Sequence, residues 1–116
     1  MAGIDAVSID EQAGPGNAGE IELVEQDGVQ VLRLRGEVDR LVVAAWEAAA
    51  PPAPRAAVAV DASAATFLDC RGLRLLLQET ATARRSGRLP ELRRPSSMVR
   101  RMVEIAGASP LFAVVL

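Results

Sequence analysis

Carboxylate, hydroxyl and thiol groups are the side chains of this sequence that could do chemistry, because histidine and lysine are both missing. Without histidine there is no imidazole general base, no Ser–His or Cys–His nucleophile and no ordinary zinc catalyst. Without lysine there is no Schiff base and no P-loop lysine to hold phosphates. A carboxylate pair stays possible, but no acidic residues stand in an obvious acid–base arrangement. We therefore expect no enzyme, no cofactor and no metal.

Two short segments combine turn-forming, helix-capping and reactive residues. They are Gly36-Glu37-Val38-Asp39 and Phe67-Leu68-Asp69-Cys70-Arg71-Gly72-Leu73. Asp39 and Asp69 stand where a helix N-cap is expected, since a carboxylate can accept hydrogen bonds from first-turn amides. Gly72 lets the backbone turn in, or lets a partner approach closely. Because sites in α/β sheets gather where strands end and helices start, we expect both segments at one edge of the sheet.

Three side chains near the second segment could be modified. Next to Arg71 and a helix N-terminus, the thiolate of Cys70 would be favoured, which makes a redox role one hypothesis. The preferred interpretation is that Cys70 is an ordinary core residue. Ser63 and Thr66 carry hydroxyls that are alternative phosphoacceptors, although such residues more commonly form local backbone hydrogen bonds.

The first half of the chain reads as a β-hairpin, a helix and a strand. Alternating residues around the Asp27-Gly28 turn predict the hairpin, whose second strand ends at Gly36. A helix over residues 40–50 is expected to bury Leu41 and a row of alanines, and the prolines of residues 51–54 stop it. A continuous apolar run over residues 56–61 predicts a central strand, followed by a short connection over residues 62–68.

The second half continues the alternation of helices and strands. One helix runs from Asp69 to the C-cap Gly87, with Leu73, Leu76, Leu77 and Thr80 buried and Glu79 in water. Pro90 makes residues 89–93 a poor strand at an edge or bulge. A last helix opens at residues 95–97 and ends at Gly107, with Met98, Met102 and Ile105 in one row and Val99, Val103 and Ala106 beside it. Residues 111–116 form a final strand or tail.

This order of elements predicts one α/β domain, because alternating strands and helices need crossover connections. We expect a mixed, mostly parallel sheet of four to five strands over residues 20–116. Residues 1–19 are rich in chain breakers and are expected to form a flexible arm, with a weak strand pattern over Ile4–Ile9. A chain of 116 residues has the usual length of one domain.

Charge and hydropathy set expectations about partners and location. Residues 1–27 carry acidic side chains and no base, whereas residues 71–101 hold most of the arginines. The basic block could steer an acidic partner or nucleic acid, but no nucleic-acid motif accompanies it, and a solvated helix surface is the preferred interpretation. A single cysteine, no signal-peptide pattern and no apolar run of about 20 residues indicate a cytoplasmic protein without membrane insertion.

At these residues the sequence resembles the STAS family, the sulfate-transporter and anti-sigma-factor-antagonist domain. In that family a strand ends in Gly-Glu-(hydrophobic)-Asp, and a second strand ends in Asp-(hydrophobic)-Ser. A short link, Phe-(hydrophobic)-Asp-Ser-Ser-Gly-Leu and a helix follow. The matching segments here are Gly36–Asp39, Asp61–Ser63 and Phe67–Leu73, and Pro95–Phe112 is similar to the last helix and tail. The resemblance covers about residues 20–113.

The resemblance implies a STAS-like fold and a docking function. An anti-sigma-factor antagonist binds an anti-sigma factor with a kinase-like ATP-binding fold and so acts on transcription, without contacting nucleic acid. It would do so here as a monomer or weak homodimer. The alternative is a structural subunit of a stressosome-type scaffold or of a lipid-transport ATPase complex. The implied partner-binding residues are Asp39, Asp69, Cys70, Arg71, Gly72 and Leu73.

Arg71 departs from the family pattern. In the members that phosphorylation switches, a partner kinase modifies the Ser immediately before the loop glycine, and that position is Arg71 here. A guanidinium has no hydroxyl and is positive where phosphoserine would be negative, so we expect the usual switch to be absent. Arg71 would then leave binding permanently on, recognise an acidic partner, mark a domain that no longer docks, or be a tolerated exposed residue.

Overall fold

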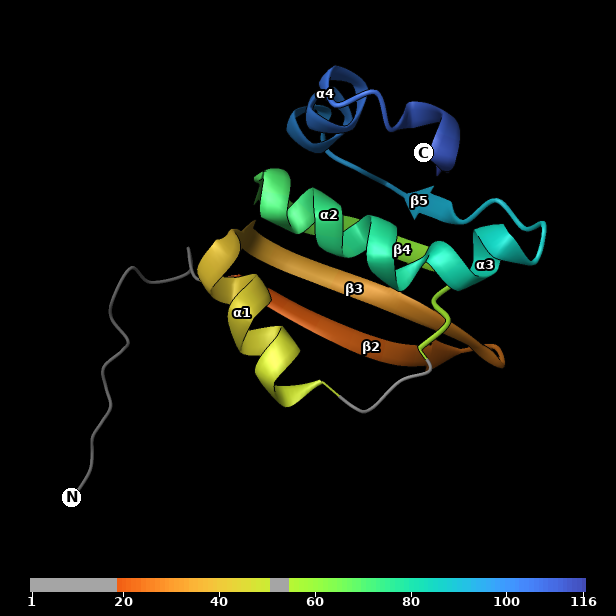
Figure 1. Ribbon diagram of the computed structural model, residues 1–116. Helices are drawn as coiled ribbons and strands as arrows, with labels where there is room; N and C mark the ends of the chain where they lie inside the picture. Colours follow the sequence, from red (N-terminus) through yellow and green to blue (C-terminus); the bar gives the residue numbers. More distant parts are fainter. Residues whose placement is uncertain (1–18, 51–54) are drawn as a thin grey trace.

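The computed structural model describes residues 19–50 and 55–116, which form one sheet with helices packed against it (Figure 1). The strand order is β2-β3-β4-β5-β6. β2 and β3 are antiparallel, and the other neighbouring strands are parallel. The elements are β2 (Glu20–Gln26), β3 (Val29–Val38), α1 (Arg40–Ala49), β4 (Ala59–Leu68), α2 (Cys70–Glu79), α3 (Ala81–Arg85), β5 (Glu91–Arg93), α4 (Ser97–Ile105), the 3₁₀-helix η2 (Ser109–Leu111) and β6 (Ala113–Val115). The predicted fold class is confirmed.

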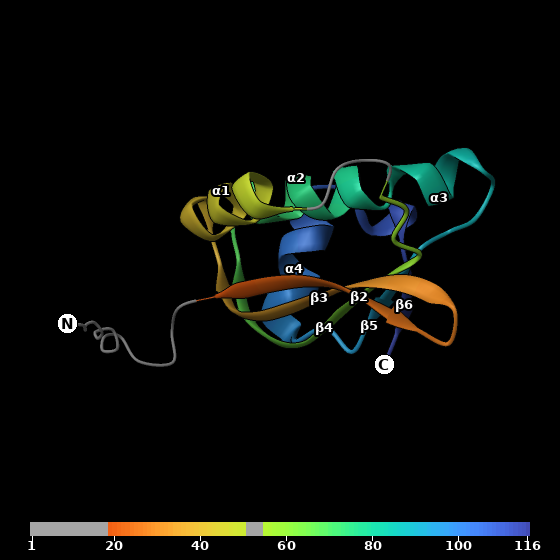
Figure 2. The same ribbon diagram turned by 90° about the horizontal axis from the view of Figure 1, so that it is seen from below.

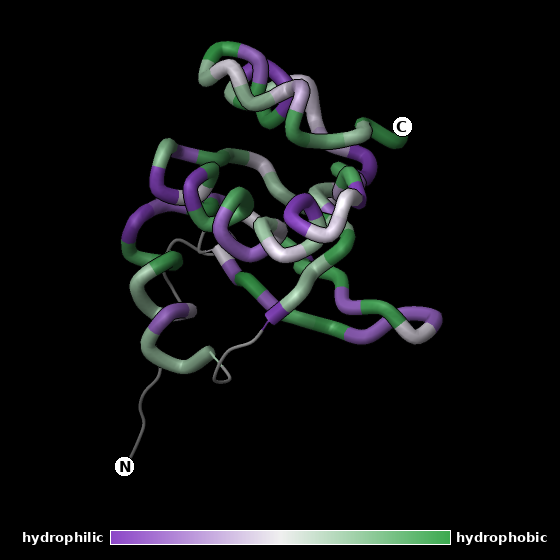
Figure 3. The backbone as a smooth tube through the Cα atoms, turned by 45° about the vertical axis from the view of Figure 1, so that its right-hand side comes forward, coloured by the Kyte–Doolittle hydropathy of each residue, from purple (hydrophilic) through white to green (hydrophobic). Residues whose placement is uncertain are grey.

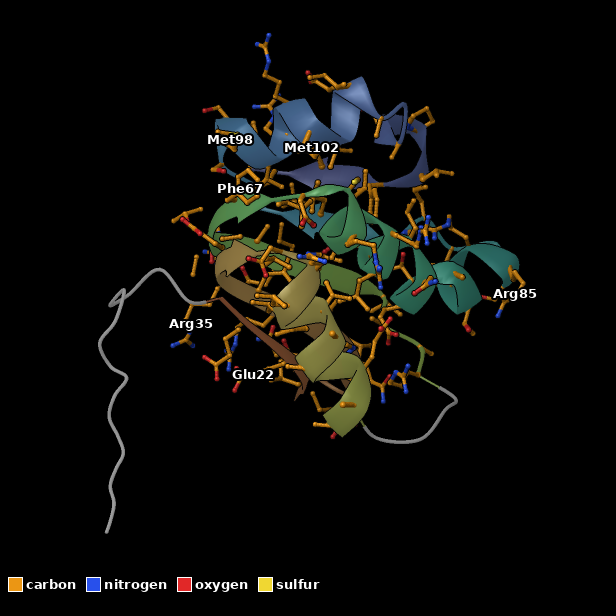
Figure 4. All side chains as sticks on the ribbon, turned by 60° about the vertical axis from the view of Figure 1, so that its left-hand side comes forward. Glu22, Arg35, Phe67, Arg85, Met98 and Met102 are labelled. Carbon is orange, nitrogen blue, oxygen red and sulfur yellow. The ribbon has the colours of Figure 1, made fainter. Side chains whose placement is uncertain are left out.

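Helices α1, α2 and α3 form a layer over one face of the sheet (Figure 2). The sheet advances in one direction from β3 to β6, so right-handed crossovers place successive helices on the same face. Helix α4 packs against β4. The other face carries the ion pairs of Glu22 with Arg33 and of Glu20 with Arg35. Glu22 and Arg35 project from this face, away from α1 (Figure 4). The apolar core therefore lies between the sheet and its helices.

The β2–β3 hairpin is confirmed, but its second strand is longer than predicted. Asp27 and Gly28 both have positive φ, 52° and 81°, as the tight turn requires. The strand does not end at Gly36, and β3 continues to Val38. Gly36 has φ 67°, and the register with β4 shifts between Gly36 and Glu37. The glycine forms an irregularity inside the strand, which the sequence pattern presented as an end.

Strand β4 is also longer than predicted. It runs over Ala59–Leu68, so the supposed connection over residues 62–68 is strand. Its extension follows from that of β3, because β4 pairs with β3 as far as Leu68 and Val38. Small side chains and two register shifts obscure the alternation that would have identified the strand.

The buried face of α1 was predicted in the wrong phase. Val43 is the residue of α1 that is fully buried, Val42 and Trp46 pack partly against the core, and Leu41 is 70% exposed. Because alanines surround these positions, the sequence shows no clear apolar stripe. The prolines of residues 51–54 lie outside the described residues, as do residues 1–18 of the predicted arm.

The predicted second helix is in fact two, α2 and α3, separated by Thr80. The buried Thr80 hydroxyl donates to the carbonyl of Leu76, 2.6 Å away. Glu79 was expected to face water but is 5% exposed. Its carboxylate receives two hydrogen bonds from Arg55, at 2.8 and 3.0 Å, and this pairing compensates its burial.

In the last third of the chain, the position of β5 in the sheet differs from the predicted edge position. β5 lies between β4 and β6 and is not an edge strand. Pro90 stands directly before β5, where its missing N–H costs no ladder bond, and its carbonyl accepts from Ala113. In α4, Val99 and Val103 are buried, whereas Met98 and Ile105 are exposed. The apolar end of the chain (Figure 3) contains the edge strand β6.

Candidate functional site

The two predicted cap residues lie at the ends of neighbouring parallel strands, β3 and β4. Asp39 follows β3 and caps α1, since its Oδ1 accepts from the amides of Leu41 and Val42 at 3.1 and 3.0 Å. Asp69 follows β4 and caps α2, since its Oδ1 accepts from the amide of Gly72 at 2.8 Å. Both N-cap predictions are confirmed.

Asp69 also connects the two helix starts to each other. Its Oδ2 accepts a hydrogen bond from the backbone N–H of Arg40, 3.1 Å away in the first turn of α1. Its own backbone N–H donates to the carbonyl of Val38 at 3.2 Å. The two segments therefore meet at one edge of the sheet, as the sequence predicted, and one carboxylate fixes their spacing.

Gly72 and Leu73 hold α2 in place and present little surface. A Cβ at Gly72 would lie 2.6 Å from Cδ1 of Leu68 and 2.9 Å from the carbonyl oxygen of Val38, so only glycine allows this approach. Leu73 is 5% exposed and belongs to the core. Both were predicted to bind a partner, and the structure places them in the packing of α2 with little exposed surface.

Cys70 and Arg71 form the exposed start of α2. The interpretation of Cys70 as a core residue is wrong, because its side chain is exposed at the first position of α2. The thiol lies outward because the buried stripe of α2 begins two residues later, at Gly72. The side chain of Arg71 is 47% exposed, and its Nη2 lies 4.0 Å from Oε1 of Glu47 on α1, a distance at which little energy is gained.

Ser63 and Thr66, the alternative phosphoacceptors, are exposed residues of β4 and not of a loop. The Ser63 hydroxyl donates to Oδ1 of Asp61 at 2.7 Å, the local hydrogen bond that such residues commonly form. Burial acts to raise the pKa of Asp61, but the Ser63 hydrogen bonds and the charges of Arg94 and Arg33 together hold that pKa below its ordinary value.

An apolar area that the sequence did not predict lies beside the start of α2. Phe67 at the end of β4 is 38% exposed, and Met98 of α4 is 52% exposed. Figure 4 shows Phe67 next to Met98 and Met102. The sequence pattern places Met98 in one row of its helix with Met102 and Ile105. Val99 and Val103 are buried and define the inner side of α4, so Met98, two residues after the N-cap Ser96, lies on the outer side. The position of Met98 relative to these two valines was the signal that could have identified it as exposed.

Two other features, a metal-binding cluster and a membrane-spanning helix, are not found among the described residues. Within residues 19–50 and 55–116, no three His, Cys, Asp or Glu side chains are grouped so that they could hold a metal ion. In the same residues, no helix combines the length and apolarity that crossing a bilayer requires.

The fold and site together define a class: a small α/β domain whose sheet edge presents two helix starts that one carboxylate joins. The chain belongs to the STAS domain family. The family model described as "Mlab, STAS domain" matches residues 21–113, which is most of the chain. A comparison with curated proteins gave no match.

Proposed function

We propose that this STAS domain is an anti-sigma-factor-antagonist-like regulator that binds an anti-sigma factor of the kinase-like ATP-binding class. The observation that carries the proposal is the joined pair of helix starts at Asp39 and Asp69, with Arg71 exposed on their surface. A rigid, exposed helix turn suits recognition by surface complementarity, because little side-chain or loop entropy is lost on binding.

The docking surface consists of exposed residues around the start of α2. Cys70 and Arg71 form its centre, and Phe67 and Met98 add apolar contact area on one side. Interfaces of this kind gain most of their energy from a few apolar or arginine anchors. The domain would therefore bind with Phe67 and Arg71 as anchors and with Asp39 and Asp69 fixing their geometry.

Arg71 makes this binding independent of phosphorylation. No hydroxyl stands at the position that a partner kinase would modify, so ATP and kinase activity would not release the complex. The same surface carries a positive charge, which favours a partner with an acidic patch.

The test measures binding and phosphate transfer with the same reagents. The full chain is mixed with a kinase-type anti-sigma factor from the same genome, and binding is measured by titration calorimetry with and without ATP. We expect binding in both conditions and no added phosphate by mass spectrometry. Arg71→Ser should gain one phosphate in the presence of ATP and then dissociate. Absence of binding to every such factor, or a phosphate on Ser63 or Thr66 of the unaltered chain, would contradict the proposal.

A structural subunit of a larger assembly is the second candidate. Arg71, which cannot be phosphorylated at the switch position, favours this second candidate. A permanent subunit does not need phosphorylation to release it from its partners. The description of the matching family model, "Mlab, STAS domain", is consistent with the lipid-transport form of this alternative. Native purification separates the two candidates. A stable membrane-ATPase complex or a large particle indicates the subunit, and exchange with a soluble anti-sigma factor indicates the regulator.

A further inference from the structure

A groove of about 630 Å³ runs between strand β2 and helix α1. Its floor includes Ile21 and Leu23 of β2, and its wall includes Leu41, Val42 and Trp46 of α1. Leu41 is 70% exposed, an unusual state for a leucine next to other apolar side chains. The groove is an apolar channel alongside a strand, and it lies on the opposite side of α1 from the start of α2.

The strand that borders the groove has a free edge. β2 ends the sheet in the described part of the chain. In an antiparallel pair, residues alternate between hydrogen-bonded and non-bonded positions, and Gln26 and Val29 flank the two-residue turn as a bonded pair. Counting back from the turn, Ile21, Leu23 and Glu25 direct their backbone N–H and C=O groups outward. Such a row can pair with another strand.

Trp46 has a polar group in this region that lacks a partner. Its indole N–H is buried, and none of the described residues accepts a hydrogen bond from it. Buried donors without an acceptor are rare in folded proteins, and each needs an explanation, such as an ordered water or an added protein group. The free edge of β2, the apolar groove and the unpaired indole N–H together point to one added strand. Extended peptides join the edges of sheets in this way.

We propose that residues 4–9 of this chain are that strand, adding to β2 antiparallel and filling the groove beneath α1. The described chain begins at Gly19, which itself lines the groove. Residues 10–19 would form the connecting loop, and they include Gly14-Pro15-Gly16-Asn17, residue types that favour turns. Ten residues can span about 33 Å, far more than the roughly 5 Å between neighbouring strands.

The sequence of this segment fits one orientation in the groove. Side chains alternate between the two faces of a strand, so Asp5, Val7 and Ile9 share one face and Ile4, Ala6 and Ser8 take the other. With Ile9 opposite Ile21, Asp5 would lie opposite Glu25, beyond the β2 residues that line the groove. Val7 and Ile9 would enter the groove against Leu23 and Trp46, while Ser8 would lie on the open face of the sheet. A tether of ten residues gives this segment an effective concentration on the order of millimolar, which favours it over a free peptide or a second copy.

Amide exchange and tryptophan fluorescence test the proposal on the full chain. Trp46 is the single tryptophan and there is no tyrosine, so the emission reports on the groove alone. We expect the amides of Ile21 and Leu23 to be protected by at least tenfold relative to the exposed turn amide of Gly28. V7D and I9D should remove that protection and shift the Trp46 emission to longer wavelength. S8D, which adds the same charge on the other face, should change neither.

Two controls separate loss of the added strand from unfolding or from other occupants. The amides of Glu22 and Val24, which face β3, and those of Leu32 and Leu34 in β3 should stay protected in every variant. If Ile21 and Leu23 exchange as fast as Gly28 in the unaltered chain, no strand is added and the proposal is wrong. It is equally wrong if their protection survives V7D and I9D or disappears on dilution, since another segment or a second copy would then cover the edge.

Discussion

The carboxylate of Asp69 accepts a hydrogen bond from the backbone N–H of Arg40, 29 residues earlier in the chain. The same carboxylate caps its own helix through Gly72. One side chain therefore satisfies an amide at the start of each of two helices, and the spacing between α1 and α2 depends on it. Conventional capping would explain an acidic residue at this position, and the link to Arg40 explains why both oxygens are needed.

Replacing each capping carboxylate by an amide separates these roles. Asp69 uses both oxygens, so in Asp69→Asn the amide NH₂ would face the Arg40 N–H or the Gly72 N–H, and one bond would be lost. Asp39 uses Oδ1 alone for both of its bonds, and asparagine can reproduce them. We expect Asp69→Asn to lower the free energy of unfolding by about 1 kcal/mol and Asp39→Asn to stay within about 0.5 kcal/mol. Urea denaturation measures both, and equal losses would contradict the two-helix role.

Gly72→Ala tests the close approach of α2 to the sheet. The added methyl group would meet the backbone carbonyl of Val38 and the side chain of Leu68. Because the carbonyl belongs to β3 and cannot rotate away, α2 must shift, at a cost of about 1–3 kcal/mol. Arg74→Ala, on the exposed side of the same helix, should change stability by less than about 0.5 kcal/mol. A Gly72→Ala variant as stable as the unaltered chain would show that α2 moves freely.

Arg55 and Glu79 provide a test of a buried ion pair. Glu79 is almost fully buried, and Arg55 approaches both of its carboxylate oxygens. Arg55→Met leaves an uncompensated buried carboxylate and should destabilise the protein by about 3 kcal/mol. Glu79→Leu in the same chain removes the charge that needed compensation and should recover most of that loss. If the double variant is as unstable as Arg55→Met, packing and not charge dominates at this site.

The sequence predicted the hairpin turn and the two caps because turn and cap residues act locally, and it predicted that the caps meet because strands alternate with helices. Asp39 and Asp69 each bind amides within three residues, so their roles follow from spacing alone. Asp27 and Gly28 likewise identify their turn. These signals do not depend on what the rest of the chain does.

The errors arose where a distant partner decides the outcome. Glu79 is buried because Arg55, 24 residues earlier, lies against it, and no local pattern contains that information. Cys70 is exposed because the buried face of α2 begins at Gly72, which depends on the position of Val38. In α1, several alanines gave no contrast between faces, so Leu41 was placed in the core although it borders the groove.

Asp61 makes the stability depend on pH in a definite direction. Burial acts to raise its pKa, but the hydrogen bonds from Ser63 and the charges of Arg94 and Arg33 leave it lower in the folded state than in the unfolded chain. The unfolded state therefore binds a proton at a higher pH than the folded state does. Ionised Asp61 adds stability above its unfolded pKa, and that contribution disappears as the pH falls through the folded pKa.

Comparison with Asp61→Asn isolates this contribution. The difference in unfolding free energy between the unaltered chain and Asp61→Asn should be constant near neutral pH and shrink on acidification. Ser63→Ala removes the hydrogen bond from the Ser63 hydroxyl but keeps the one from its backbone amide, so it should raise the pKa of Asp61 and move the decline to higher pH. Carboxyl ¹³C shifts measure that pKa directly. A difference that grows in acid would mean that burial outweighs Ser63 and the two arginines, and that Asp61 is strained and not stabilised where it lies.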